Sequence, residues 1–443
     1  MTIYALSTGP GVSGLAVIRV SGKDTRVVIN KITGKSVPKP RTAVRRKFNK
    51  ISDNQLIDEG LLLWFPGPAS YTGEDMAEFH VHGSRAVINE IQNSLSQISN
   101  LRLAEAGEFT KLAFQNGKIN LLRAESVADL ISSETEIQRQ QAINVMSGKS
   151  SDKFNSLRER LLKILSKVEA KIDFPEDDLP DDILLNIHSE VKSIREEIMK
   201  ILNDQKVGER IREGFKISIV GPTNAGKSSL LNYLSKRDVA IVSEIAGTTR
   251  DIIETHLNLD GYPVVISDTA GIRDSKDEIE KKGIKLALKK AEKSDLNIIV
   301  IEPKSIDFTH FFNDKISKKA ILVINKMDLG TDQISNEIKK YNPIYLSIKE
   351  EKNIDKLINS IKENLKNKFI SSEEIFITRE RHRINLEQCF ESLKNFEQKK
   401  SLEDFDKAAE DLRLATRYLG IIVGKVDIEE ILGSIFNDFC IGK

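Results

Sequence analysis

The segment GPTNAGKSS at Gly221–Ser229 constrains this chain more than any other feature. It follows the apolar run FKISIV at 215–220 and precedes the helical run SSLLNYL at 228–234. A phosphate-binding loop requires this context, because glycines let backbone amides approach phosphates and the helix N-terminus offers unpaired N–H groups to negative charge. We therefore expect Lys227 to reach the outer phosphates of a nucleotide and Ser228 to bind Mg²⁺.

Two further motifs follow apolar runs in the register that such a site needs. After PVVISD come Asp268, Thr269, Ala270 and Gly271. The aspartate at a strand end suits a magnesium-bound water, and the glycine amide suits the γ-phosphate. After KAILVI come Asn325, Lys326, Met327 and Asp328. A carboxylate only accepts hydrogen bonds, so it matches guanine, which offers two donors where adenine does not.

The full set of residues predicted to bind the nucleotide combines these motifs with the loop SEIAGTTRD that would cover the phosphates. The set is Asn224, Ala225, Gly226, Lys227, Ser228, Ser229, Ser243, Glu244, Ile245, Ala246, Gly247, Thr248, Thr249, Asp268, Thr269, Ala270, Gly271, Asn325, Lys326 and Asp328. The segment Ser347, Ile348, Lys349 stands where a backbone contact to the base is common. Thr249 is the expected second magnesium ligand.

The residue that orients the attacking water is left open by the sequence. Many GTPases place a Gln after the aspartate and glycine motif, whereas this chain has Ile272. The alternatives are the acidic residues Asp274, Asp277, Glu278 and Glu280, and the arginines Arg250 and Arg273 for charge stabilisation. Asn224 with backbone carbonyls would also form an all-oxygen cage for a monovalent cation, which would replace an arginine finger.

The hydrophobic patterns predict a chain of several domains. Its 443 residues exceed one ordinary core and suggest about three. Residues 1–118 mix short strands and helices and predict an α+β domain, while 119–210 and 375–443 carry helical spacing. Residues 211–374 alternate strands and helices, which predicts a mostly parallel Ras-like α/β sheet inserted into the helical domain. Asp260 and Gly261 predict a hairpin at its edge.

Composition excludes some partners and leaves others open. Hydrophobic residues make up 40% and charged residues 30%, and 67 basic residues face 66 acidic ones, so no overall positive field gathers nucleic acid. Two clusters are candidates for local RNA contact, and each otherwise forms a solvated charged face. They are Arg41, Arg45, Arg46 and Lys47, and Arg379, Arg381, His382 and Arg383. With two cysteines and no leader or long apolar stretch, we expect a cytoplasmic protein without a membrane segment.

Motifs along the whole chain resemble the MnmE (TrmE) family of tRNA uridine modification GTPases. They are SYTGED at 70–75, GEFTKLAFQNGKINL at 107–121, DFPEDD at 173–178, GTTRD at 247–251 and the terminal FCIGK. Departures are Ala106 and Ser84, where Pro and Gly are common, and Ile348. The resemblance implies a homodimer joined through N-terminal folate-binding domains. It also implies a complex with the flavoprotein MnmG that adds an aminomethyl or carboxymethylaminomethyl group to the wobble uridine of certain tRNAs, with FAD and NADH entering through that partner.

The resemblance also implies roles for individual residues. A tetrahydrofolate derivative, the one-carbon donor, would be contacted by Arg19, Glu78, Lys118 and Lys443. Potassium would be held by Asn224, Ser243, Ile245 and Thr248, and magnesium by Ser228 and Thr249. Glu280 would act on the hydrolytic water, with Asn224 and Lys227 completing the catalytic set, as the G domains dimerise across the nucleotides. GTP hydrolysis would drive a conformational cycle.

Other interpretations share part of this pattern. Cys440, beside Lys443, is a candidate reactive thiol, against plain packing and against a poor match to a prenylation signal. A ribosome-assembly switch GTPase would share every nucleotide motif but needs a basic RNA-binding module, which neither end provides. A membrane-remodelling GTPase would need an amphipathic or apolar membrane segment. The motifs outside the nucleotide site therefore favour the tRNA-modifying function.

Overall fold

The computed structural model describes most of the chain. The described residues are 1–173, 182–237, 254–268, 288–304, 317–330, 336–369, 374–399, 405–426, and 432, 435, 436, 439 and 442. They form two compact units. The first contains residues 1–128, 145–169 and 412–443, and the second contains 129–144 and 170–411.

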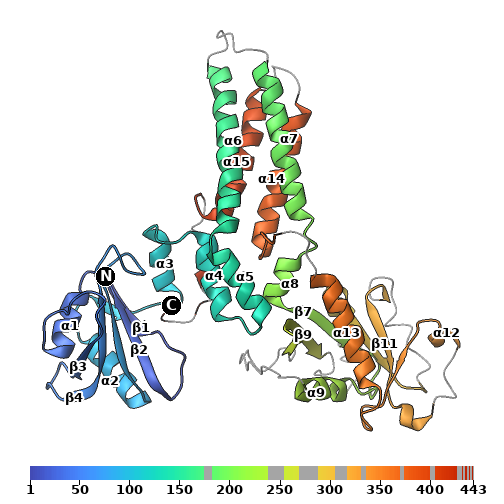
Figure 1. Ribbon diagram of the computed structural model, residues 1–443, viewed down its shortest axis with the longest axis horizontal. Helices are drawn as coiled ribbons and strands as arrows, with labels where there is room; N and C mark the ends of the chain where they lie inside the picture. The colour runs from blue at the N-terminus through green and yellow to red at the C-terminus, as the bar shows by residue number, and fades with distance from the viewer. Residues whose placement is uncertain are drawn as a thin grey trace, which may run out of the picture. The chain divides into compact units, whose positions relative to one another are not determined.

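The first unit contains a six-stranded sheet in the order β3-β4-β5-β2-β1-β6 (Figure 1). Its neighbouring strands are antiparallel except for the parallel pair β1 and β6. The strands are β1 Thr2–Leu6, β2 Ser13–Ser21, β3 Val44–Asn49, β4 Leu56–Phe65, β5 Met76–Gly83 and β6 Leu101–Leu103.

Helices cover both faces of this sheet, because its apolar side chains alternate along the strands. The helices α1 (Thr25–Thr33) and α2 (Arg85–Ser96) bury one face, where Ile18 and Phe79 lie in the core. On β1 the alternate residues Ile3 and Ala5 pack instead against Phe109 of α3 (Glu108–Gln115). The predicted α+β fold of the N-terminal part is confirmed.

The end of the chain packs within the first unit, beside α3 and α4 (Leu121–Ile131). Phe436 and Phe439 share a buried cluster with Leu121 of α4. Farther on, the hydroxyl of Ser7, just after β1, donates a hydrogen bond to the carbonyl oxygen of Gly442 at 2.8 Å. Gly442 is therefore held against the end of β1. Most of α6 (Lys149–Asp173) and most of α15 (Phe405–Val423) also belong to this unit.

The second unit contains the predicted α/β sheet, in the order β12-β11-β10-β7-β9-β8. All neighbours are parallel except β8 and β9, which form the predicted hairpin at Asp260 and Gly261, both with positive φ. The strands are β7 Phe215–Val220, β8 Glu254–Leu259, β9 Tyr262–Asp268, β10 Leu296–Ile301, β11 Ala320–Ile324 and β12 Ile344–Tyr345.

Both faces of this sheet are buried, as the continuous apolar strands predict. The helices α9 (Lys227–Arg237) and α13 (Ile354–Phe369) pack against one face. The helical residues 288–293 and α12 (Asn336–Lys339) pack against the other. Strand β10 has every side chain buried. The chain enters this sheet from α8 (Val207–Glu213) and leaves it toward α14 (Glu380–Gln398), so the α/β fold is inserted between helices.

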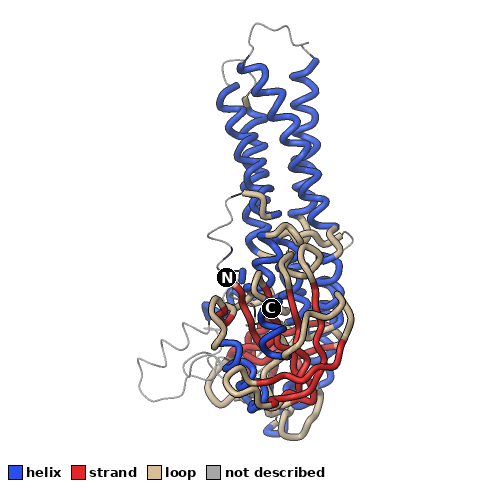
Figure 2. Tube along the Cα trace, turned by 90° about the vertical axis from the view of Figure 1, so that its left-hand side faces the viewer, coloured by secondary structure: helices blue, strands red, loops and turns tan. Residues whose placement is uncertain are grey.

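Outside the two sheets the described chain is mostly helical (Figure 2). In the second unit α7 (Asp182–Leu202) packs along α14, with α5 (Glu136–Met146) nearer the sheet (Figure 1). The helical spacing predicted after residue 375 is present on α14, where Leu386 and Leu393 are buried and Phe390 is half-buried beneath the guanidinium of Arg195. Among the described helices none has the length and apolar content of a membrane span.

Candidate functional site

The phosphate loop leaves the carboxyl end of β7 and turns into α9, as the sequence predicts. Two of its positions require glycine. Gly221 has φ +147°, and a Cβ there would lie 2.0 Å from the carbonyl oxygen of Val300 in β10. Gly226 has φ +98°, and a Cβ there would lie 2.2 Å from Nδ2 of Asn325. The loop is therefore seated tightly against the sheet, with its backbone left open to a ligand.

Lys227 is the first residue of α9, and its side chain turns back over the loop. The ammonium donates hydrogen bonds to the carbonyl oxygens of Gly221 at 3.0 Å and Pro222 at 2.8 Å. Ser228, Ser229 and Asn224 are exposed, and Asn224 has φ +63°, which asparagine tolerates better than most residues. The cation, the hydroxyls and the start of the helix are thus arranged as binding of an anion would require.

Asn325 joins the motif predicted to bind the base to the phosphate loop. This buried side chain donates from Nδ2 to the carbonyl of Ala225 at 2.9 Å and accepts the N–H of Ile348 on Oδ1 at 3.2 Å. Three motifs that are far apart in the sequence thus meet at one amide group. The sequence predicts that Asn325 contacts the base. Its link between the three motifs depends on long-range hydrogen bonds that no local pattern reveals.

Asp328 is exposed and held ready to accept hydrogen bonds. The hydroxyl of Ser347 donates to its Oδ1 at 2.7 Å, and this bond holds the pKa of the Asp328 carboxyl below its ordinary value. Nearby, the ammonium of Lys326 pairs with Glu302 at 2.8 Å. The sequence predicts only a backbone contact for Ser347. The hydrogen bond from its hydroxyl to Asp328 was not predicted.

The remaining predicted nucleotide and metal residues lie outside the described part of the chain. They are Ser243, Glu244, Ile245, Ala246, Gly247, Thr248, Thr249, Thr269, Ala270, Gly271 and Glu280, together with the alternatives Arg250, Arg273, Asp274, Asp277 and Glu278. For Asp268 the backbone is described. It ends β9 beside Ile219, the second-to-last residue of β7, which ends at Val220 just before the phosphate loop.

A second polar site lies in the first unit around Arg19 of β2. Its guanidinium pairs with Oε1 of Glu78 on the adjacent strand β5 at 2.8 Å. The same guanidinium carbon lies 5.6 Å from the ring centroids of both Tyr71 and Phe109. Burial raises the pKa of Tyr71, whose hydroxyl bonds to Thr110 at 2.9 Å. Two aromatic rings therefore fix a paired cation and carboxylate on the sheet face near α3.

The SYTGED loop and the chain end approach the same region. Asn116 donates to the carbonyl of Thr72 at 2.7 Å, and the Cε of Lys118 lies 3.1 Å from where a Cβ on Gly73 would stand. Gly442 is held by Ser7, which directly follows the β1 strand that pairs with β2. Lys443 and Cys440 themselves lie outside the described residues. The structure brings Arg19 and Glu78 into contact and places Lys118 against the SYTGED loop.

The second basic cluster does not form a solvated surface. Arg379, His382 and Arg383 are 8%, 1% and 6% exposed, and the expectation of a charged face open to solvent or RNA is wrong for these three. Arg379 pairs with Asp129 at 2.7 Å, and Arg383 pairs with Glu209 at 2.7 Å. In the first cluster Arg41, Arg45 and Lys47 are exposed, and Arg45 pairs with Glu59 at 3.0 Å.

Comparisons with known proteins agree along the whole chain. A family model described as the GTP-binding protein TrmE N-terminus matches residues 2–118, and one described as the MnmE helical domain matches 121–440. A tRNA modification GTPase MnmE from Pelagibacter ubique is 70% identical, and one from Rickettsia bellii is 45% identical, each covering 100% of both chains.

Among solved structures, the G domain of the T. maritima FeoB iron transporter is 25% identical. The match covers 34% of this chain and 98% of that one, with a TM-score of 0.25. Aquifex aeolicus Era bound to GDP and AlF4⁻ is 22% identical over 42% of this chain and 68% of its own, with a TM-score of 0.27. These likenesses are partial, and assignment to a family follows from the full-length relatives.

Proposed function

Because the chain belongs to the MnmE family of tRNA modification GTPases, we propose that its GTP hydrolysis serves the modification of tRNA. The proposed product is an aminomethyl or carboxymethylaminomethyl group at C5 of the wobble uridine. A homodimer of this chain would make it in the cytoplasm, in complex with the flavoprotein MnmG. A tetrahydrofolate derivative would supply one carbon, and FAD and NADH would enter through the partner.

The site around Arg19 is the observation that carries this proposal. Arg19 and Glu78, paired with each other, would face the pterin ring of a folate, where the carboxylate accepts from N–H donors, and Lys118 would offer a cation to its carboxylates. The rings of Tyr71 and Phe109 hold Arg19 in place. A ribosome-assembly GTPase would need the guanine-nucleotide site but would have no use for this second one. We propose that Lys443 completes the folate site, since the neighbouring Gly442 is anchored at the end of β1.

In the nucleotide site each residue keeps the role that the motifs predict. Lys227 would bind the outer phosphates, Ser228 and Thr249 would bind Mg²⁺, and Asn325 and Asp328 would fix guanine. Asn224, Ser243, Ile245 and Thr248 would bind K⁺, and Glu280 would orient the attacking water as two G domains meet. Mg²⁺ and K⁺ would supply the positive charge that offsets the charge developing on the phosphates.

Potassium dependence is tested by comparing GTP turnover in KCl and NaCl at equal ionic strength. We expect turnover in KCl to be faster by at least about tenfold, because a monovalent cation bound at Asn224 replaces an arginine finger at the developing charge. Choline chloride at the same ionic strength serves as the control. Equal rates in the two salts would rule out the potassium site and leave the arginines at 250 and 273 as the alternatives.

The tRNA function is tested by nucleoside mass spectrometry of tRNA from cells that lack the gene. We expect the modified wobble uridines to disappear and to return on expression of the full chain. Arg19→Gln should fail to restore them, because it leaves the Glu78 carboxylate without its partner. Arg139→Gln, which removes an exposed arginine paired with Glu136, serves as the matched control and should restore them. Unchanged wobble uridines with altered ribosome profiles would favour the assembly-factor function instead.

A further inference from the structure

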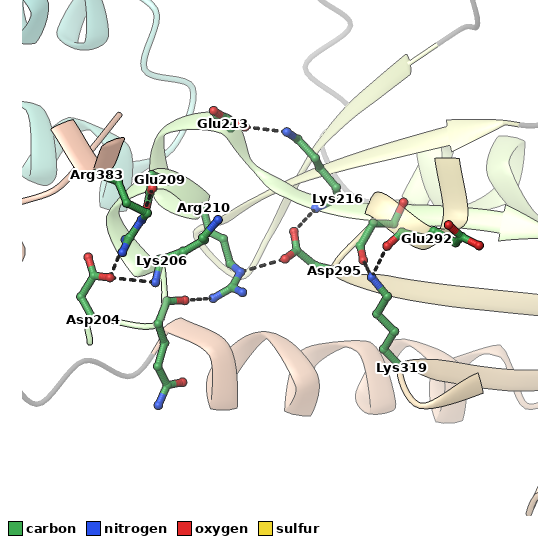
Figure 3. Close-up of polar contacts among 12 residues, drawn as sticks. Asp204, Lys206, Glu209, Arg210, Glu213, Lys216, Glu292, Asp295, Lys319 and Arg383 are labelled. Carbon is green, nitrogen blue, oxygen red and sulfur yellow. Dashed lines mark hydrogen bonds and ion pairs between the residues drawn. The ribbon is translucent and has the colours of Figure 1, made fainter. Parts of the chain in front are cut away.

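The short helix α8 lies between the helices of the second unit and its α/β sheet, β7 to β12, which we call the G-domain sheet. Its last residue, Glu213, is separated from β7 only by Gly214, and β7 leads directly to the phosphate loop. Successive residues of this helix hold different segments of the chain (Figure 3). Successive helical side chains are turned by about 100°, so a single short helix reaches partners on several sides.

On one side α8 is bound to α14 by a forked ion pair. Nε and Nη2 of Arg383 donate to the two carboxylate oxygens of Glu209, each at 2.7 Å. Nη2 also donates to Asp204 at 2.6 Å, and Nη1 donates to the carbonyl of Leu202 at 2.9 Å. The Arg383 side chain is 8% exposed. A buried guanidinium with this many partners fixes both distance and orientation, which a single contact does not.

On another side α8 is bound to the sheet through Asp295, which precedes β10. Oδ1 of Asp295 accepts from Nε of Arg210 at 2.8 Å, and Oδ2 accepts the N–H of Lys216 at 3.0 Å. The N–H of Asp295 in turn donates to the carbonyl of Lys216 at 2.8 Å. One carboxylate therefore joins α8 to the first residues of β7 and β10. These are neighbouring central strands, and Gly221 at the end of β7 is packed on Val300 of β10.

Two further contacts extend the same arrangement to α4 and α5. Arg212 donates to Asp129 at 2.9 Å, and Asp129 also accepts from Arg379 at 2.7 Å. The carbonyl of Gly208 accepts from the side chain of Gln141 in α5 at 2.9 Å. Gly208 lies so close to the carbonyl of Ile377 that a Cβ would stand 2.0 Å from that oxygen. Residues 208, 209, 210 and 212 of one helix thus each hold a different part of the second unit.

We propose that α8 is the joint through which the nucleotide state of the G domain is passed to α14 and α5, with Asp295 and Arg383 as its positioning residues. The inference rests on the guanine-nucleotide site proposed above. Buried ion pairs of this kind contribute little net stability compared with apolar packing, but they specify one geometry. Because residues 208, 209, 210 and 212 of α8 each hold a different segment, the helix cannot shift or turn with the starts of β7 and β10 without moving its helical partners.

The test is hydrogen exchange of the full chain with GDP and with a non-hydrolysable GTP analogue. In the unaltered protein we expect the amides of α8 and of the first turns of α14 to change their exchange rates by at least about threefold between the two nucleotides. Asp295→Asn should remove this difference while leaving the affinity for both nucleotides within about twofold, since the residue lies outside the nucleotide motifs. Thermal melting of each protein shows whether it folds cooperatively.

Arg383→Lys provides an independent variant and Asp260→Asn the matched control. Lysine keeps the charge but cannot make the forked bond to Glu209, so it should also lose the difference between nucleotides. Asp260 carries an exposed carboxylate of the same unit that accepts from Lys362 of α13 at 2.9 Å rather than from α8, and its variant should keep the difference. A merely structural role would lower the melting temperature and leave the difference intact.

The outcomes separate this inference from the proposed function. If the unaltered protein binds guanine nucleotides but shows no exchange difference in α8 and α14, the inference is wrong. It is also wrong if either Asp295→Asn or Arg383→Lys folds and keeps the difference, or if Asp260→Asn loses it as well. If Asp295→Asn fails to melt cooperatively, Arg383→Lys decides alone. If the unaltered protein binds neither nucleotide, the guanine site itself is wrong.

Discussion

Replacing Asp328 with asparagine is expected to lower the affinity for GTP by at least about 100-fold and to create affinity for XTP. The Asp328 carboxylate can accept from both the ring N–H and the amino group of guanine. An amide offers one acceptor and places an NH₂ group against the other donor. Losing one hydrogen bond to a charged group, worth about 1.5–3 kcal/mol, and leaving a donor of the base unsatisfied, which costs about 1–3 kcal/mol more, predicts a decrease of this size. Xanthine carries an oxygen in place of the amino group, so the amide N–H would meet an acceptor.

The measurement is titration of the full chain with GTP, GDP and XTP, followed by turnover of GTP and XTP. Ser347→Ala is the matched control, because it removes only the hydroxyl that donates to Asp328 at 2.7 Å. We expect it to weaken GTP binding by no more than about tenfold and to leave the preference for guanine, since the carboxylate remains. Undiminished GTP affinity in Asp328→Asn would mean that the base is recognised elsewhere.

The features that could be predicted from the sequence are those set by local patterns. The strands of the parallel sheet are continuous apolar runs because both faces are buried, and this composition appears in the sequence itself. The hairpin at Asp260 and Gly261 was predictable because both residues accept positive φ, which a tight turn of this kind requires. The phosphate loop was predictable because its glycines are needed wherever the backbone approaches phosphate.

Long-range pairing of charged residues could not be predicted in this way. Arg379 and Arg383 look like surface residues by composition, and they are buried because Asp129 and Glu209 meet them from segments far away in the chain. Nothing local distinguishes a paired arginine from a solvated one. The same limit applies to Asn325, whose bond to Ala225 joins two motifs that the sequence presents separately. The role of Arg19 was predicted only from the family resemblance. Its contacts with the rings of Tyr71 and Phe109 are visible only in the structure.

Gly226→Ala is expected to reduce GTP binding by at least about 100-fold and to destabilise the fold by about 2–4 kcal/mol. Two effects add. The backbone at φ +98° is strained for any residue with a Cβ, and the new methyl group would stand 2.2 Å from Nδ2 of Asn325. To relieve that contact, Asn325 must release the carbonyl of Ala225 or the loop must move. Either change separates the phosphate loop from the motif that we propose to fix the base.

Gly261→Ala isolates the first effect, the backbone strain, because Gly261 has φ +88° and open space where its Cβ would be. It should show only the backbone strain, about 1–2 kcal/mol in urea unfolding, with GTP affinity unchanged. Comparing the two variants by unfolding and by nucleotide titration therefore separates backbone strain from the contact with Asn325. If both lose the same stability and both keep GTP, Asn325 does not hold the loop in its binding conformation. If Gly226→Ala alone loses GTP, binding depends on the junction between the two motifs, because neither Lys227 nor Asp328 has been altered.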